Sequence, residues 1–174
     1  MICGVRLVEH IVNPDHRGTL ATISRESETG LFSQWNWVNS VANVLRGVHA
    51  HQHYDELYAF IAGRMFVMLK DARRWSATFG VEQSFWSDEI EQRSLLVPRG
   101  VAHAIFFSGA GTVVYGLSRA WTGEGELCCH WTDPSIKVSW PARAPLLSEK
   151  DAAAGTFSEM VAALQQHRSD QNHP

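Results

Sequence analysis

Histidine stands out among the residues able to do chemistry, since the 174-residue chain has nine against fifteen lysines and arginines. Three of them, His49, His51 and His53, alternate just before Glu56. Alternate residues of a β-strand face one side of a sheet, so these imidazoles can project into one cavity. An imidazole titrates near pH ~6.5, which suits such a cluster to proton transfer at neutral pH or to metal binding.

A second histidine motif lies about forty residues further along. His103 follows the turn Pro98-Arg99-Gly100, so the chain contains Pro-x-Gly-x-x-His after His-x-His, a glutamate and a glycine. This pair of motifs resembles the cupin superfamily, whose metal-binding members use such residues around one divalent ion. The resemblance implies a possible site for Zn, Ni, Fe or Mn; a polar barrel lining without metal is the alternative. The matching residues are His49, His51, Glu56 and His103.

The elements that position these residues are expected to be short strands. Apolar, partly aromatic and β-branched runs at 57–61, 65–69, 95–97 and 112–115 are bounded by glycine or proline. Ile136, Val138 and Trp140 alternate with polar residues, which predicts a half-buried strand. Many short strands separated by turns indicate an all-β cupin or jelly-roll barrel.

The C-terminal part of the chain is expected to be helical. Four apolar residues follow the i, i+3, i+4, i+7 pattern of an amphipathic helix, and Thr156 with Glu159 fits a capping box. The four residues are Phe157, Met160, Val161 and Leu164. We therefore predict one cupin-like domain over residues 1–164 and a polar, frayed tail over 165–174.

Composition excludes several classes of protein. Hydrophobic residues make up 45% and charged residues 19%, as in an ordinary globular domain. The cysteines, Cys3, Cys128 and Cys129, are odd in number and lack redox or metal spacing, which argues against a disulfide framework. A net charge of −3 argues against a general nucleic-acid binder. With neither a membrane-length apolar run nor a signal peptide visible, we expect a cytoplasmic protein without a membrane partner.

Ordered segments from Asp15 to Asp151, and less clearly beyond, form the widest pattern in the chain. They are Asp15-His16-Arg17-Gly18, Val44-Leu45-Arg46-Gly47-Val48-His49 preceded by Gln34 and Asn36, Ser76-Ala77-Thr78-Phe79-Gly80, Val97-Pro98-Arg99-Gly100-Val101-Ala102-His103, Thr132-Asp133-Pro134, Ser139-Trp140-Pro141 and Leu147-Ser148-Glu149-Lys150-Asp151-Ala152-Ala153-Ala154. Their order and spacing resemble the dTDP-4-dehydrorhamnose 3,5-epimerase family, which is itself cupin-like.

The resemblance implies an isomerase that epimerises a sugar carbon beside a ketone. A C–H bond α to a carbonyl is acidic enough for an enzyme base, and the enolate is then reprotonated from the opposite face. By motif position the base is His49, the carboxylate that holds it is Asp151, and the acid is Tyr115. The resemblance also implies an NDP-4-keto-6-deoxyhexose substrate, no required cofactor, and a homodimer formed by strand exchange. The expected substrate-binding residues are Arg17, Gln34, Asn36, Arg46, His51 and His103.

One departure from the family pattern bears on the chemistry. The family has a lysine that helps stabilise the enolate oxygen, and Glu56 stands at the aligned position here. A carboxylate repels a developing oxyanion unless a metal or a proton intervenes. His51 is therefore expected to replace the lost lysine as the cation. Leu20 and Thr22 also replace the family's phenylalanine and glutamate.

Three other interpretations stay open. In a metal-dependent cupin enzyme, the ion would occupy His49, His51, Glu56 and His103 and act as a Lewis acid, so His49 would not be a free base. A sugar 3,4-ketoisomerase shares Arg-Gly-x-His-Ala-His but lacks the Leu-Ser-x-Lys-Asp segment that is present here. A non-catalytic sugar-binding cupin would not need the three predicted catalytic residues.

Overall fold

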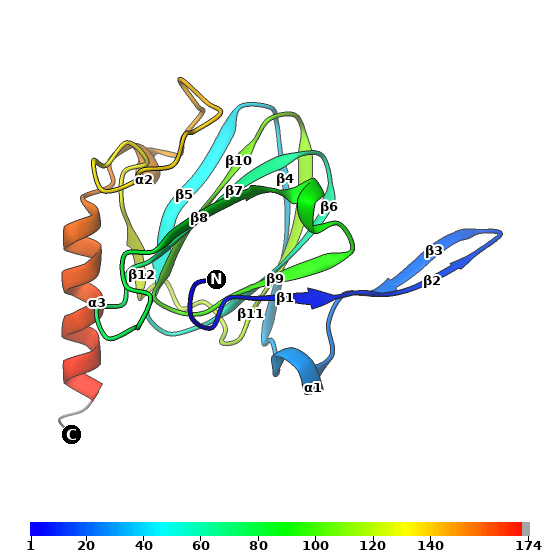
Figure 1. Ribbon diagram of the computed structural model, residues 1–174, viewed down its shortest axis with the longest axis horizontal. Helices are drawn as coiled ribbons and strands as arrows, with labels where there is room; N and C mark the ends of the chain where they lie inside the picture. Colours follow the sequence, from blue (N-terminus) through cyan, green and yellow to red (C-terminus); the bar gives the residue numbers. More distant parts are fainter. Residues whose placement is uncertain (172–174) are drawn as a thin grey trace.

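The computed structural model describes residues 1–171, and its centre is two five-stranded antiparallel sheets that face each other (Figure 1). The first sheet has the order β1 (Arg6–Glu9), β9 (Arg93–Val97), β6 (Glu56–Ala62), β11 (Gly111–Leu117) and β4 (Gln34–Ser40). The second has the order β12 (Glu126–Cys128), β5 (Val44–His51), β10 (Val101–Phe107), β7 (Met65–Asp71) and β8 (Glu82–Trp86). This arrangement confirms the predicted cupin jelly roll and the four apolar runs expected to be strands.

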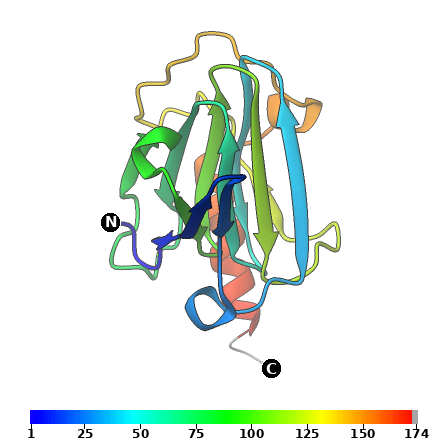
Figure 2. The same ribbon diagram turned by 90° about the vertical axis from the view of Figure 1, so that its right-hand side faces the viewer.

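The remaining elements lie outside the two sheets. A two-stranded hairpin, β2 (Ile11–Asp15) with β3 (Gly18–Thr22), projects away from the barrel (Figures 1 and 2). The short helical elements are α1 (Glu26–Thr29), the 3-10 turn η1 (Ser87–Ile90) and α2 (Glu149–Ala152), and the long helix is α3 (Phe157–Gln171). Within the described residues, no helix has the length and apolar character needed to cross a membrane.

Every residue of β7 and of β10 is buried, because both faces of these central strands are covered. On the barrel side, Val67 and Ile105 belong to a core cluster with residues of the first sheet. On the outer side, Met68 and Ala104 belong to a second cluster together with Met160 of α3. Strands buried on two faces read as continuous apolar runs rather than as alternating ones.

Helix α3 confirms the apolar pattern, since Phe157, Met160, Val161 and Leu164 are its buried residues. Thr156 and Glu159 form the predicted reciprocal cap, because Glu159 Oε2 accepts from Thr156 N at 2.6 Å and Thr156 Oγ1 accepts from Glu159 N at 3.2 Å.

The helix continues through part of the segment that was predicted to be frayed. Side chains one turn apart hydrogen-bond along it, Gln166 to Asp170 at 3.0 Å and His167 to Gln171 at 2.9 Å. Such pairs stabilise a helix whose residues are otherwise polar. The last part of the predicted tail, 172–174 with His173, lies outside the described residues.

The predicted half-buried strand at Ile136, Val138 and Trp140 was wrong. The segment from 136 to 140 has no regular secondary structure; it follows a turn closed by Ile136 N donating to Asp133 O, and Lys137 N donates to the carboxylate of Glu82. Its backbone groups therefore do not join a sheet. The alternation arose because the three apolar side chains pack against the core under α3.

Candidate active site

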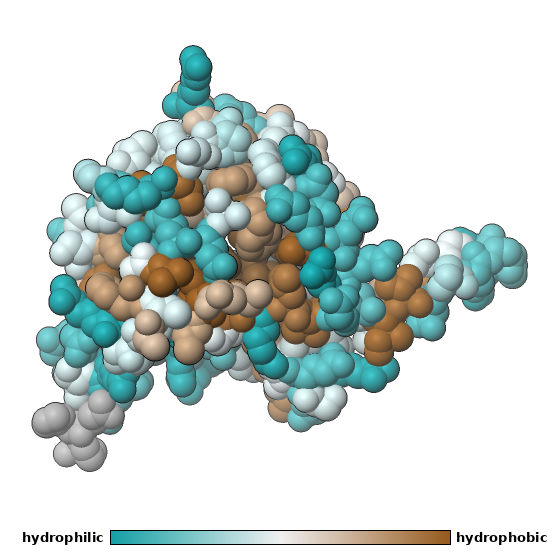
Figure 3. All heavy atoms as spheres, viewed as in Figure 1, coloured by the Kyte–Doolittle hydropathy of each residue, from teal (hydrophilic) through white to brown (hydrophobic). Residues whose placement is uncertain are grey.

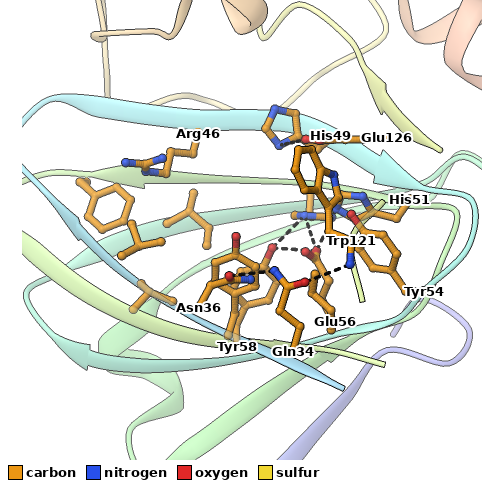
Figure 4. A pocket seen from close by; sticks show the side chains of 17 residues that line it. Gln34, Asn36, Arg46, His49, His51, Tyr54, Glu56, Tyr58, Trp121 and Glu126 are labelled. Carbon is orange, nitrogen blue, oxygen red and sulfur yellow. Dashed lines mark hydrogen bonds and ion pairs between the residues drawn. The ribbon is translucent and has the colours of Figure 1, made fainter. Parts of the chain in front are cut away.

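A cavity of about 360 Å³ opens between the two sheets, and most of the predicted site residues line it (Figure 4). Its wall combines carboxylate, imidazole, phenol and guanidinium groups with apolar side chains from the barrel core. The predicted residues on the wall are Gln34, Asn36, Arg46, His49, His51, Glu56, His103 and Tyr115.

A β-bulge in β5 sets which side chains enter this cavity. His49 pairs with His103 of β10, but the next pair along is Gly47 with Ala104, so the register shifts at this point. Arg46 and His49 are three residues apart and would face opposite sides of a regular strand, yet both line the cavity. An extra residue in a strand re-aims its side chains in this way.

His49 is held by Asp151, the pair predicted from motif position although its members are 102 residues apart. His49 Nε2 lies 2.6 Å from Asp151 Oδ1. Asp151 itself is fixed at the start of α2, where its backbone N–H donates to the capping Ser148 Oγ at 3.1 Å. The other ring nitrogen, Nδ1, lies 3.4 Å from Glu126 Oε1 on the cavity wall.

The surroundings of His49 make it a stronger base than a free imidazole. Burial lowers its pKa, but the hydrogen bond and charge of Asp151, with a further contribution from Cys128, outweigh burial and raise the pKa. The pKa of Asp151 is lowered by the same contact despite its burial. A carboxylate on one nitrogen fixes the tautomer and stabilises the imidazolium that forms when the other nitrogen accepts a proton.

Glu56 gathers three hydrogen-bond donors at the buried end of the cavity. Its Oε2 accepts from Tyr58 Oη at 2.7 Å, from His103 Nε2 at 2.9 Å and from His51 Nε2 at 3.1 Å. Burial opposes the charge, but His103 and His51 hold the pKa of Glu56 well below its usual range. The group is therefore an ionised carboxylate whose donors are already in place.

The two histidines of this group differ in their contacts. His103 Nδ1 lies 3.2 Å from the backbone oxygen of Val101, and its Nε2 lies 2.9 Å from Glu56 Oε2 and 3.0 Å from Tyr58 Oη. Burial lowers the pKa of His51, and its Nδ1 is buried without a hydrogen-bond partner among the described residues. The lowered pKa does not favour His51 as the cation in place of the family lysine, and that role stays a prediction.

Tyr115 comes from β11 and stacks on Tyr58, with ring centroids 5.3 Å apart. Burial, together with the charges of Glu56 and Glu126, raises the pKa of Tyr115 above its ordinary value. The phenol therefore keeps its proton at neutral pH and is able to donate it.

The predicted four-residue metal set is divided in the structure. One ligand atom each of His51, Glu56 and His103 lie within 4.8 Å of one another, whereas His49 groups instead with Cys128 and Asp151. The two groups are separated because Nε2 of His49 is directed at α2 rather than at Glu56.

Two predicted residues lie elsewhere. Arg17 is on the projecting hairpin, where its side chain is 78% exposed and its guanidinium pairs with Asp15 at 2.6 Å. His53, the third alternating histidine, follows the end of β5 and packs edge-on against His167 of α3. The alternation of histidines therefore predicts a shared face only up to His51, where β5 ends.

Several residues of the site carry no motif and were not predicted. Glu126 lies beside His49 and pairs with Lys150 at 2.7 Å. Burial raises the pKa of the Glu126 carboxyl, but Lys150 and His49 outweigh burial and lower this pKa below its ordinary value. Trp121 and Tyr54 reach the wall from loops. The pairing of β12 with β5, which sequence spacing does not reveal, brings Glu126 and Cys128 to the site.

Comparisons with known proteins agree on one family. The family model of dTDP-4-dehydrorhamnose 3,5-epimerase matches residues 1–159. The chain is 35% identical over 132 residues to the dTDP-4-dehydrorhamnose 3,5-epimerase of Pseudomonas aeruginosa, covering 74% of this chain and 73% of that protein. It is 31% identical over 146 residues to the spore coat polysaccharide biosynthesis protein SpsL of Bacillus subtilis, covering 80% and 97%.

Solved structures show the same similarity over nearly the whole fold. The dTDP-6-deoxy-D-glucose-3,5-epimerase of Legionella pneumophila, solved with dTDP-4-keto-L-rhamnose, matches with a TM-score of 0.81 and 28% identity, covering 92% of this chain and 91% of that one. An epimerase of Mycobacterium tuberculosis matches with a TM-score of 0.83 and 28% identity, covering 96% and 93%.

Proposed function

The chain belongs to the dTDP-4-dehydrorhamnose 3,5-epimerase family, and on this premise we propose that it epimerises a nucleotide-linked 4-keto-6-deoxyhexose at C3, C5 or both. The observation that carries the proposal is the pair of His49 and Asp151, 2.6 Å apart, on the wall of a cavity large enough for a sugar. A dTDP-linked sugar is the first substrate to test. The relative from Pseudomonas aeruginosa is named for such a substrate, and the matching structure from Legionella pneumophila was solved with one bound.

Proton abstraction is assigned to His49. With Nε2 bonded to Asp151, Nδ1 is the nitrogen on the Glu126 side of the ring and accepts the proton α to the C4 ketone. Asp151 stabilises the imidazolium that results. Tyr115, whose raised pKa keeps it a phenol, donates the proton that restores the carbon from the opposite face.

Stabilisation of the enolate oxygen is assigned to Arg46, because the donors around Glu56 are already engaged. The guanidinium of Arg46 lines the cavity, and its Nε donates to Ser40 Oγ at 3.0 Å. Among the described residues no carboxylate pairs with it, so its terminal N–H groups can be directed at substrate. A preorganised cation stabilises the transition state, in which negative charge develops on the oxygen, more than it stabilises the ground state, and so it lowers the barrier.

The reaction proposed here needs no cofactor. Each of His51, His103 and Tyr58 already directs a polar atom at the ionised Glu56, so the charge of this carboxylate is balanced by side chains of the protein. A metal-dependent enzyme built on His51, Glu56 and His103 would instead lose activity when a chelator is added. This difference separates the two mechanisms experimentally.

A homodimer completes the proposal. The hairpin leaves Arg17 far from its own cavity, with its guanidinium exposed, and the tip of the hairpin is hydrophilic (Figure 3). In a dimer the hairpin of one protomer would reach its partner, and Arg17 would meet the diphosphate of the nucleotide. Guanidinium groups bind phosphate oxygens through paired hydrogen bonds.

The test uses the full chain in chelator-containing deuterated buffer with a dTDP-4-keto-6-deoxyhexose. NMR should show deuterium entering at C3, C5 or both, and His49→Ala should slow this exchange by roughly 10²- to 10⁴-fold. His167→Ala, which changes a histidine outside the cavity, is the matched control. Exchange that survives in His49→Ala would contradict the assignment of the base. Formation of a 3-keto sugar would indicate a ketoisomerase, and nucleotide-sugar binding without exchange would indicate a binding protein.

A further inference from the structure

The thiol of Cys128 lies against His49. Cys128 of β12 is the direct partner of His49 in the pairing of β12 with β5, so the two side chains share one face of the sheet. Cys128 also contributes to raising the pKa of both His49 and Lys150, as expected of a thiol in contact with each. None of the roles assigned to the epimerase reaction uses this thiol.

Three different ligand types converge at this point. One ligand atom each of His49, Cys128 and Asp151 lie within 4.8 Å of one another. Imidazole nitrogen, thiolate sulfur and carboxylate oxygen are the donors that Zn²⁺ takes in proteins, at about 2.0 to 2.3 Å. Three protein donors leave one position of a tetrahedral ion open, which water or substrate can fill.

The charge around the cluster also suits a cation. Asp151 is a carboxylate with a lowered pKa, and Glu126, also ionised, lies 3.4 Å from His49 Nδ1. Lys150 is the opposing cation, with its Nζ 2.7 Å from Glu126. Two carboxylates thus lie beside the cluster, and a divalent ion would supply the positive charge that they otherwise favour on His49.

We propose that His49, Cys128 and Asp151 form a site for a soft divalent cation such as Zn²⁺, and that occupation of the site blocks the enzyme. Binding displaces into solvent the proton of the Cys128 thiol and the proton that Asp151 helps to hold on His49, and the freed lone pair of His49 binds the ion. The binding site itself does not depend on the proposed function; the inhibition rests on His49 being the base. Because thiolate favours zinc-like ions, Mg²⁺ and Ca²⁺ should not compete.

Binding is measured first, without any assay of catalysis. The full chain is freed of metal with a chelator and titrated with Co²⁺, whose thiolate charge-transfer absorption reports cysteine ligation, and Zn²⁺ is then used to displace it. We expect one Co²⁺ per chain with a thiolate band, and at least about a tenfold loss of affinity in Cys128→Ser. Cys3→Ser, at an exposed cysteine, is the control and should bind normally.

Two further variants keep the proposal falsifiable if Cys128→Ser is poorly folded. Lys150→Met removes the opposing positive charge and should tighten Co²⁺ binding. Glu56→Gln changes the other buried group and should leave the thiolate band intact. A thiolate band that persists in Cys128→Ser, or binding that is lost only in Glu56→Gln, would overturn the proposal.

Inhibition is then tested by solvent deuterium exchange with added Zn²⁺ or Mg²⁺. Zn²⁺ should stop exchange at the concentrations that displace Co²⁺, and Mg²⁺ should not. If the protein binds Co²⁺ through Cys128 but shows no deuterium exchange even without metal, the metal site is supported and the proposed epimerase function is rejected. Exchange that continues while Zn²⁺ is bound would reject the inhibition.

Discussion

One carboxylate oxygen of Glu56 accepts hydrogen bonds from Tyr58, His103 and His51, at 2.7 to 3.1 Å. Where the family carries a lysine, this chain thus has an anion that engages the neighbouring donors. We therefore assign the positive charge that meets the substrate to Arg46, on the same wall as His49. On this proposal, the change of side chain at position 56 moves the task of stabilising the enolate to another residue.

The link between Asp151 and the basicity of His49 predicts a pH effect. His49 must be unprotonated to act, and Asp151 raises its pKa, so kcat/KM should rise with pH through a pKa above the ordinary 6.5. Asp151→Asn removes the charge that stabilises the imidazolium, so the acidic limb of the profile should move to lower pH while the maximum falls.

The measurement is kcat/KM across pH in chelator-containing buffer. Glu159→Gln changes an exposed carboxylate of α3 and should leave the profile unchanged. An acidic limb that stays in place in Asp151→Asn would show that another group sets it.

Arg46 provides a second prediction at this scale. Arg46→Gln removes the cation assigned to the enolate and should lower kcat by about 10²- to 10³-fold, as loss of an oxyanion donor does. Arg46→Lys keeps the charge and should recover part of the rate. Equal losses in both variants, or a change in KM alone, would place Arg46 on the diphosphate instead. Steady-state kinetics on folded variants distinguish these outcomes.

At the scale of elements, the bulge in β5 aligns Arg46 and His49 with one cavity. Gly47 stands at the register shift with φ 126°, and a Cβ built there would lie 2.6 Å from Ala104 Cβ. Only glycine allows both the backbone conformation and the close approach of β10. The site therefore depends on a residue that contributes no side chain.

Gly47→Ala should consequently reduce both stability and activity. Strain and overpacking together should lower the free energy of unfolding by about 2–5 kcal/mol. Gly18→Ala is the matched control, because Gly18 has φ 131° but nothing within 4 Å of an added Cβ. Chemical denaturation should show a clearly larger loss for Gly47→Ala; equal losses would mean that packing against Ala104 is not the cause.

At the scale of the whole molecule, two exposed features indicate association. Trp35 and Trp37 are 46% and 69% exposed on β4, on the face opposite Gln34 and Asn36 of the cavity wall. The hairpin projects from the same side of the barrel, and every residue of β3 is exposed (Figure 2). Large exposed aromatic side chains on one sheet face are typical of a protein interface.

A substitution on this face should separate the protomers. Sedimentation equilibrium should give twice the mass of the chain for the natural sequence and the mass of one chain for Trp37→Glu. Trp75→Glu changes another exposed tryptophan, between β7 and β8, and should remain dimeric. A dimeric Trp37→Glu would place the interface elsewhere, and a monomeric natural protein would reject the dimer.

The sequence by itself determined the fold class, the strand-length runs, the start of α3 and the family. The elements could be predicted because hydrophobic periodicity and turn residues are local properties of the chain. The family could be predicted because its motifs occur in order along the sequence. It also named eight of the residues on the cavity wall, most of them carried by those motifs.

Only the tertiary structure decided how these residues are divided. Strand pairing joins His49 to Cys128, the packing of α2 beside β5 brings Asp151 to His49, and the facing of the two sheets brings Glu56 to His51 and His103. Distances between distant segments depend on register and packing, which no local pattern encodes. For the same reason the apparent strand around Val138 proved to be an irregular segment that packs against the same core cluster as α3.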